Sequence, residues 1–456
     1  MVPLAAAQPT GEERLIGDEE LFFSTTDSQG VIRSVNASFA LVSRYEPSEL
    51  IGCPHNILRH PAMPRGAFKL LWDRLLSGRP MACYVVNLAE DGAYYWVFTT
   101  ITPLDDGYLA VRIRPRSRHF QDIVRVYAEV RAVEQEAERA GAGNRAAAGL
   151  GAAALESRVR GLGFADFGQF ITEALPAEMA AHTARQTRAG DSVGAAAGFG
   201  EILAAVDALD ERFTDLVGLL DTYQSLARSL SASSASVLQA SHQLRRAVAA
   251  ARTGSAEQAG QAQVLRTVAE AMSRPADQTV ETLTQLTEKL DRLGPAIAAL
   301  RYRIALARLH DDMVATLVCD MADVGHDPAD PAEPEGPLSE IGQLCDALGA
   351  GIDEMTRAME AVNRELTSSA TLIAKAAEQL TDFRRFLAKW RLLVVRHGRT
   401  RELDPYVGPI DEQLANGYDQ LEGLQDLSRH CLKGITTLDA GSMHRQLARM
   451  RAAVRA

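Results

Sequence analysis

The amino-acid sequence predicts an α+β domain at the N-terminus, followed by an all-α region of long helices with coiled-coil periodicity. Before about residue 120, apolar and polar residues alternate between short Gly- and Asp-containing turns, a pattern typical of antiparallel strands. After it the chain is rich in Ala, Leu, Gln, Glu and Arg, which are good helix formers. Apolar residues there recur about every 3.5 residues, which indicates helices packed side by side.

The composition limits the class of protein. At 456 residues the chain is too long for one domain, and two to four units are expected. A hydrophobic fraction of 46% and a charged fraction of 23% indicate a folded, soluble protein. The net charge of −11 argues against nucleic acid as the main partner, because phosphate binding requires a basic face. The five cysteines are scattered without metal-ligand spacing, so reduced thiols and no metal site are expected.

The location of the protein is predicted from two absences in the sequence. No stretch approaches the roughly 18 consecutive apolar residues of a membrane-spanning helix. The segment 1–10 is short and uncharged, without the basic start of an export signal. We therefore expect a cytoplasmic protein without a transmembrane segment.

The α+β domain is expected over residues 18–116. Four alternating segments predict its strands: 31–35, 83–88, 94–103 and 108–114. Short helical patches lie between the first two strands, at 37–45 and 66–77. A strand, helices and then a run of antiparallel strands is an α+β arrangement.

A connecting region is predicted over residues 119–200. Residues 119–138 have the composition of a helix that leaves the domain. The Gly/Ala-rich stretch 140–154 is interpreted as a flexible joint, since glycine weakens a helix.

A long antiparallel helical hairpin is predicted over residues 201–322. Apolar residues are spaced alternately by four and three from Ile202 to Val248, and again from Leu283 to Ile304. The first arm would be roughly 70 Å long, and the chain is expected to reverse near residue 254. Gly294-Pro295 interrupts the second arm, so a kink or a helix restart is expected there. We call each such row of apolar residues along a helix a seam. These seams fit an intermolecular coiled coil and the core of a single-chain helix bundle equally well.

The remainder divides into a linker and C-terminal helices. Residues 323–337 are acidic with four prolines, which predicts an extended linker. Residues 338–456 are predicted to be helical, with a third seam from Ile341 to Val394 and a last helix over about 410–451, after the Pro405 and Pro409 break.

One group of motifs lies in the N-terminal domain. It begins with Asn36-Ala-Ser-Phe39, Arg44-Tyr45 and Glu49-Leu-Ile-Gly52, and continues with Pro54-His-Asn-x-x-Arg-His-Pro-x-Met-Pro64 and Tyr95-Trp-Val97. These motifs resemble the PAS domain of the bacterial aerotaxis receptor family. The resemblance covers residues 18–116, about a fifth of the chain.

The resemblance implies a noncovalently bound FAD whose redox state reports oxygen or electron-transport status. Carried over to this sequence, it implies five cofactor-facing residues: Asn36, Arg59, His60, Trp72 and Asn87. Three departures from the family pattern are expected to weaken FAD binding: Ala62 in place of an acidic residue, Met81 in place of Trp, and 88–91 in place of a basic run. Haem is a lesser alternative, since His55 or His60 could ligate iron.

The helical hairpin resembles that of the chemoreceptors more distantly. The segment Val248-Ala-Ala-Ala-Arg-Thr-Gly254 is similar to the start of the tip that binds the chemotaxis kinase and its coupling protein. However, Ala249 stands where a Glu is usual, and the Gly-Arg-Gly-Phe turn is absent. The tip is therefore degenerate, and an ordinary Ala-rich hairpin is the alternative interpretation.

Together these features predict a cytoplasmic PAS-domain signal transducer of the redox or oxygen-sensing, aerotaxis type, with helical output. No catalytic set and no metal-ligand set is found, so an enzyme is not expected. A homodimer through the helices and chemotaxis signalling proteins are the expected partners. The alternative function is a cofactor-free PAS and coiled-coil scaffold for protein interaction.

Overall fold

The computed structural model describes residues 7–18, 20–183, 197–257, 263–323 and 336–455. These residues form two compact units. The first unit comprises Met1–Leu216, Arg301–Met355 and Asp439–Ala456, and the second comprises Val217–Leu300 and Thr356–Leu438. The predicted Pro-rich linker lies almost entirely outside the described residues.

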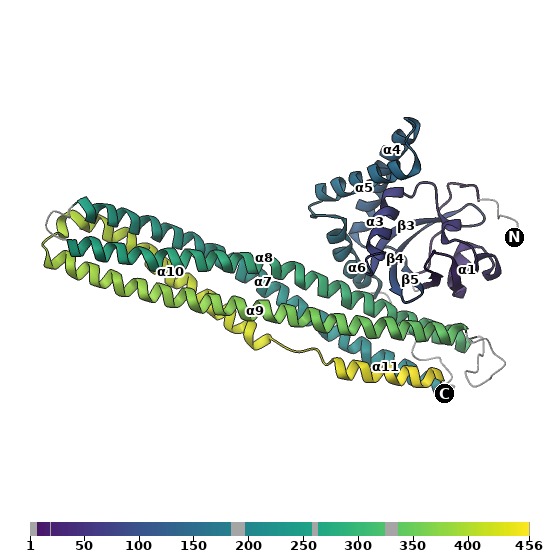
Figure 1. Cartoon of the computed structure of the whole chain (residues 1–456). Coiled ribbons are helices and arrows are strands. Elements are labelled where there is room, and N and C mark those ends of the chain that lie inside the picture. Colours follow the sequence, from purple (N-terminus) through teal and green to yellow (C-terminus); the bar gives the residue numbers. More distant parts are fainter. Residues whose placement is uncertain (1–6, 19, 184–196, 258–262, 324–335, 456) are drawn as a thin grey trace. The chain divides into compact units, whose positions relative to one another are not determined.

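A five-stranded antiparallel sheet is the centre of the first unit (Figure 1). Its strands are β1 (Phe22–Asp27), β2 (Ile32–Val35), β3 (Met81–Leu88), β4 (Tyr94–Leu104) and β5 (Gly107–Ile113). They pair in the order β2-β1-β5-β4-β3, so the first and last hairpins meet through β1 and β5. The segment between β2 and β3 forms α1 (Ala37–Ser43), α2 (Pro47–Leu50), the 3₁₀ helix η1 (His55–Leu58) and α3 (Arg65–Leu75). An α+β domain followed by long helices confirms the predicted fold class.

The two faces of the sheet carry different side chains. One face holds small and polar residues that line a cavity, among them Ser24, Thr26 and Thr99. The other face is aromatic: Tyr84 and Trp96 lie against Phe120, with ring centroids 5.9 and 5.5 Å apart. Since successive side chains of a strand point to opposite faces, one sheet serves both surfaces.

Three helices follow the sheet: α4 (Arg118–Arg139), α5 (Asn144–Gly161) and α6 (Phe167–Thr183). The buried Glu178 of α6 ties this helix to the start of α4. Its carboxylate accepts hydrogen bonds from the Ser117 backbone N–H and hydroxyl, at 3.0 and 2.7 Å, and from the Tyr84 hydroxyl at 2.7 Å. The Gly/Ala-rich stretch 140–154, predicted to be a flexible joint, is instead helical from Asn144 onward as part of α5.

Four long helices provide the second unit: parts of α7 (Ala197–Glu257), α8 (Gln263–Asp323) and α9 (Gly336–Arg396), with α10 (Thr400–Gly434). At least one side-chain contact joins each neighbouring pair, which makes a four-helix bundle. These contacts are Ser234 with Thr287, Lys289 with Glu365, Arg391 with Asp411, and Tyr223 with the Gly434 carbonyl.

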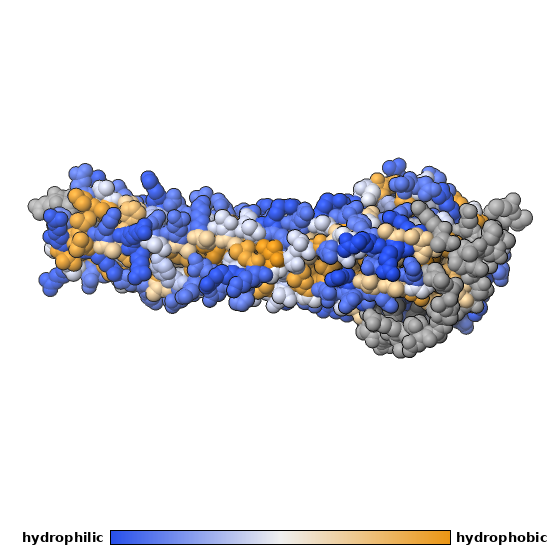
Figure 2. Space-filling view, turned by 90° about the horizontal axis from the view of Figure 1, so that it is seen from below, coloured by the Kyte–Doolittle hydropathy of each residue, from blue (hydrophilic) through white to orange (hydrophobic). Residues whose placement is uncertain are grey.

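The helical seams are filled within the single chain. Every residue of the α7 seam except Leu216 is buried, as are all residues of the α9 seam from Ile341 to Val394. Of the two alternatives left open by the sequence, the structure therefore has the bundle core. Figure 2 shows a mainly hydrophilic surface along the helices, interrupted by apolar patches.

Helix ends differ from the sequence prediction at three places. The expected interruption at Gly294-Pro295 is not a helix restart, because α8 continues through Pro295. Likewise, α10 includes Pro405 and Pro409, and it ends at Gly434 instead of near residue 451. A separate helix α11 (Ala440–Arg455) follows, where Arg451 pairs with Asp346 of α9 at 2.7 Å. Among the described residues, no helix is long and apolar enough to cross a membrane.

Candidate ligand cavity

A cavity of about 530 Å³ lies between the sheet and the segment η1–α3. This volume is within the range of about 300–1,000 Å³ that is common for small-molecule sites. The strands contribute inward-facing residues at alternate positions, namely Ser24, Thr26, Val85, Asn87, Thr99, Ile101, Ala110 and Arg112. The opposite wall comes from η1 and α3, and a third group of lining residues comes from the first turns of α5.

The charged side chains of the lining are all cationic. They are Arg59, Arg65, Lys69, Arg112 and Arg145, and no Asp or Glu is among the described residues that line the cavity. Two of these cations have carboxylate partners outside the lining: Arg65 pairs with Glu138 at 3.0 Å and Lys69 with Asp73 at 2.6 Å. Such a surface favours an anionic ligand.

Arg112 is the deepest of these cations and is fixed by its neighbours. It is only 4% exposed, and its guanidinium donates to the Ser24 hydroxyl at 3.0 Å. A second nitrogen lies 2.8 Å from His55 Nε2, and the guanidinium carbon lies 5.1 Å from the centre of the Phe39 ring. Burial lowers the pKa of Arg112 to about 10, so the group stays charged at neutral pH.

His55 is a neutral hydrogen-bond acceptor in this arrangement. Burial of the ring, followed by the positive charge of Arg112, lowers the pKa of His55 to about 3. Its Nε2 therefore faces the Arg112 N–H with a lone pair. Iron ligation by this nitrogen would break that hydrogen bond, so the geometry does not favour haem at His55.

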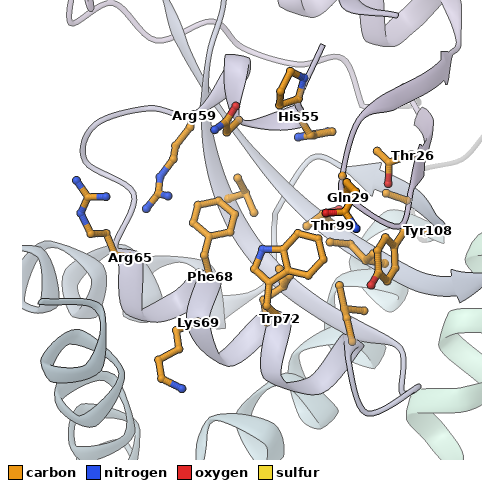
Figure 3. A pocket seen from close by; sticks show the side chains of 18 of the residues that line it. Thr26, Gln29, His55, Arg59, Arg65, Phe68, Lys69, Trp72, Thr99 and Tyr108 are labelled. Atoms are coloured by element: carbon orange, nitrogen blue, oxygen red, sulfur yellow. The ribbon is translucent and has the colours of Figure 1, made fainter. Parts of the chain in front are cut away.

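Aromatic rings form the middle of the cavity wall. Trp72 and Phe68 lie on α3 and both line the cavity. The Arg59 guanidinium covers the Phe68 ring at 4.4 Å, and the Trp72 ring meets Tyr108 edge to face at 5.4 Å. Figure 3 shows Arg59, Arg65 and Lys69 on one side of the two α3 rings. On the other side lie the neutral groups Thr26, Gln29 and Tyr108.

Three of the five residues implied by the family resemblance line the cavity: Arg59, Trp72 and Asn87. The other two do not. Asn36 is the N-cap of α1, where its side-chain oxygen accepts from the Phe39 and Phe23 backbone N–H groups and its amide donates to the Leu21 carbonyl. His60 accepts from the Ala62 N–H through Nδ1 at 3.1 Å and is outside the lining. We therefore leave both out of the ligand-facing set.

Four cations of the lining were not identified from the sequence: Arg65, Lys69, Arg112 and Arg145. Arg112 stands in a strand between Val111 and Ile113, and alternation alone predicts a solvent-facing side chain there. Arg145 lies in the Gly/Ala-rich stretch, which was interpreted as a flexible joint and not as part of a ligand site. Only the tertiary packing of α5 on α3 brings it to the cavity.

The junction of α3, α4 and α5 supports the outer wall of the cavity. Glu134 of α4 is fully buried, and its carboxylate accepts the Arg65 and Gly66 backbone N–H groups of α3 at 3.0 and 2.8 Å. It also lies 3.3 Å from Arg131. Gly66 and Gly151 allow this contact: a Cβ on Gly66 would lie 2.2 Å from Ala152 N, and one on Gly151 would lie 2.0 Å from the Glu134 carboxylate.

Comparison with known proteins identifies the N-terminal domain. Residues 32–111 match the family model described as "PAS fold", in agreement with the five-stranded sheet and the helical segment that covers its cavity. The first unit therefore contains a PAS domain, as the sequence motifs predict.

Two curated proteins are similar to the same part of the chain. An aerotaxis receptor of Escherichia coli (strain K12) is 34% identical over 123 residues, which are 26% of this chain and 24% of the receptor. A nitrogen fixation regulatory protein of Klebsiella pneumoniae is 27% identical over 90 residues, covering 20% of this chain and 18% of that protein. The chain thus spans a quarter or less of the length of these relatives.

Solved structures with a similar fold include light-oxygen-voltage domains. One, studied with a flavin analogue, is 22% identical, and the match covers 26% of this chain and 89% of that chain, with a TM-score of 0.21. A second, from a fungal light-oxygen-voltage photoreceptor, is 19% identical over 23% of this chain and 79% of that one, with a TM-score of 0.19.

Proposed function

We propose that this chain is a PAS-domain signal transducer that binds FAD noncovalently in the cavity and senses redox or oxygen status. The observation that carries the proposal is the cavity itself. Its described lining residues combine five cations and no carboxylate with the Trp72 and Phe68 rings. FAD joins a planar ring to two phosphates, so it matches both features. The relation to an aerotaxis receptor supports the same ligand.

The residues fit the cofactor in separate parts of the cavity. Trp72 and Phe68 would pack on the ring system, while Asn87 and Gln29 would hydrogen-bond its polar rim. The half-buried Arg65 and the exposed Lys69 would face the phosphates. When bound, a flavin supplies a redox change that alters the charge and hydrogen bonding of its ring. Arg112, held by Ser24 and His55, would keep a fixed positive charge beside it.

The signal is proposed to leave the cavity through α3. This helix carries Arg65, Phe68, Lys69 and Trp72 on the ligand side, and its first N–H groups bind Glu134 of α4. A ligand-dependent shift of α3 would therefore change the position of α4. A packed junction with fixed hydrogen bonds responds by rearrangement, since close-packed interiors do not deform continuously.

Absorbance of the purified full chain and titration with FAD test the proposal. We expect the paired flavin bands, or saturable FAD binding to colourless protein, and a loss of affinity on the order of tenfold in Trp72→Ala through lost stacking. Leu76→Ala is the matched control, because Leu76 follows α3, is 76% exposed and lies outside the cavity lining. Absence of FAD binding at saturating concentration contradicts the proposal and favours the cofactor-free scaffold.

The output partners are part of the same proposal. We expect a homodimer through helices and an association with chemotaxis signalling proteins. Sedimentation of the full chain tests the first, and pull-down with the chemotaxis kinase and coupling protein tests the second. A monomer at high concentration contradicts the homodimer, and no capture of either protein contradicts the association with chemotaxis proteins. Neither result bears on the proposal that the cavity binds FAD.

A further inference from the structure

We infer that α5, which lies beyond the PAS fold, completes the ligand site, and that its Arg145 binds the phosphate groups of a nucleotide. The inference rests on the proposed function and extends it to a residue outside the matched region, which ends at residue 111. Asn144, Arg145 and Ala148 from the first turns of α5 line the cavity. Asn144 and Arg145 precede Ala148 by four and three residues, so each lies on the same side of the helix as Ala148.

Among the described residues, Arg145 has no carboxylate partner, whereas the neighbouring cations Arg65 and Lys69 each have one. Arg65 and Lys69 each pair with a carboxylate, Glu138 and Asp73. In the ranges that the structure describes, no carboxylate lies within salt-bridge distance of Arg145, which is exposed. Its guanidinium is therefore available for charge-assisted hydrogen bonds to phosphate oxygens, which arginine binds with two parallel N–H groups.

The position of Arg145 is fixed by the packing of α5. Ala147 and Leu155 of this helix are fully buried, and the helix backbone approaches α3 at Gly66 so closely that a Cβ there would lie 2.2 Å from Ala152 N. At the same place, Gly151 lies against the Glu134 carboxylate that accepts from the α3 N–H groups. The cavity rim and the α4 carboxylate are thus held by one helix, so a nucleotide that contacts Arg145 also stabilises the α3–α4–α5 junction.

Ligands with and without phosphate separate this role from a general effect on the site. Binding of FAD, riboflavin and ADP to the full chain is compared between wild type, Arg145→Ala and Arg145→Lys by calorimetry. We expect Arg145→Ala to lower the affinity for FAD and ADP by roughly tenfold, the usual effect of losing a hydrogen bond to a charged group. Riboflavin binding should change less than about twofold. Arg145→Lys should lose less affinity for ADP than Arg145→Ala, because lysine keeps the charge but not the paired N–H groups.

Arg160→Ala is the matched control. Arg160 is an exposed arginine near the end of the same helix, outside the cavity lining, and its removal should leave all three affinities unchanged. An equal loss of riboflavin affinity in Arg145→Ala, or an equal effect of Arg160→Ala, overturns the inference. Circular dichroism of each variant excludes unfolding as the cause of a loss.

The experiment distinguishes failure of this inference from failure of the proposed function. If wild type binds ADP in an Arg145-dependent manner but binds neither flavin, the phosphate site stands and the flavin proposal fails. If wild type binds FAD and the Arg145 variants bind it equally well, the flavin proposal stands and the phosphate site fails. Absence of binding for all three ligands overturns both.

Discussion

The two units of the molecule bury different kinds of polar residue. In the second unit, every buried polar side chain among the described residues is a serine or threonine. These are Ser234, Ser241, Ser255, Thr279, Thr282, Ser369 and Ser428. The first unit buries charged or titratable groups as well, among them Arg112, Glu134, Glu178, His310 and Asp311.

The second unit is thus stabilised mainly by an apolar core, whereas the structure of the first unit also depends on specific polar contacts. A small hydroxyl can donate a hydrogen bond to a backbone carbonyl of its own helix, as Thr279 does to the Pro275 carbonyl at 2.8 Å. Its burial therefore lowers the stability of the bundle only slightly. A buried charge requires a dedicated partner, since its desolvation is expensive. Arg112 and Glu134 both have such partners next to the cavity. The first unit therefore has a buried charge, Arg112, in the lining of the cavity itself.

Substitution in the apolar bundle is expected to have the largest effect on stability alone. Trp390 is fully buried in the second unit and its Nε1 donates to Ser255 at 3.3 Å. Trp390→Ala should lower the unfolding free energy of this unit by about 3–5 kcal/mol, because it leaves a cavity. Hydrogen exchange over 217–300 and 356–438 measures it. Leu392→Ala, 71% exposed on the same helix, is the control. A change in FAD affinity in Trp390→Ala would break the separation between the units.

Removal of the Glu134 charge at the α3–α4 contact tests whether buried polar contacts stabilise the first unit. Glu134→Gln keeps one acceptor for the α3 N–H groups but loses the charge that faces Arg131. It should lower the unfolding free energy of the first unit by about 1.5–3 kcal/mol, as expected for hydrogen bonds to a charged group. Denaturant titration checks this, with Glu136→Gln as control, since Glu136 is exposed on the same helix and pairs with the exposed Arg139. Equal stability of both variants would show that the buried carboxylate is not required.

The same contrast determines what the sequence could predict. The seams of α7, α8 and α9 were predicted residue by residue, because a repeat of about 3.5 residues directly reports which side of a helix is buried. Four of the five strands, β2 to β5, were predicted from their alternation for the same reason, whereas β1 (Phe22–Asp27) was not predicted. Neither pattern contains information about which charged residues meet. Arg112 reaches Ser24 and His55, and Glu134 reaches the α3 N–H groups, only through contacts between distant segments.

Two local signals were ambiguous for physical reasons. The Gly/Ala-rich stretch predicted a flexible joint, yet Gly151 and Ala152 permit the close packing of α5 on α3 and α4. A missing side chain gives backbone freedom in isolation and close approach within a packed structure. Asn36 shows the second ambiguity: an asparagine before a helix suits both a cap and a ligand contact, and its three hydrogen bonds make it a cap.

A methyl group at this glycine contact should have a moderate effect on stability and ligand binding together. In Gly151→Ala the new Cβ would lie 2.0 Å from Glu134 Oε1, so the carboxylate or α5 must move. We expect a loss of about 1–3 kcal/mol in unfolding free energy through overpacking, with weaker FAD binding. Gly149→Ala is the matched control two residues away, where a Cβ would meet nothing within 4 Å, and should be neutral or slightly stabilising. Unchanged FAD affinity in Gly151→Ala would show that the position of α5 does not affect the ligand site.

The last prediction concerns the pH dependence of stability. His55 has a pKa of about 3 in the folded protein because of burial and Arg112, whereas an unfolded histidine titrates near 6.5. Between these values the unfolded chain binds a proton that the native state does not, so this histidine makes stability fall as the pH decreases from about 6.5 toward 3. His55→Gln keeps an acceptor for Arg112 and removes the titration. The variant should match wild type near pH 8 and lose stability less steeply between pH 6 and 4 in thermal unfolding curves, while parallel curves for the two proteins would mean that His55 is not held neutral beside Arg112.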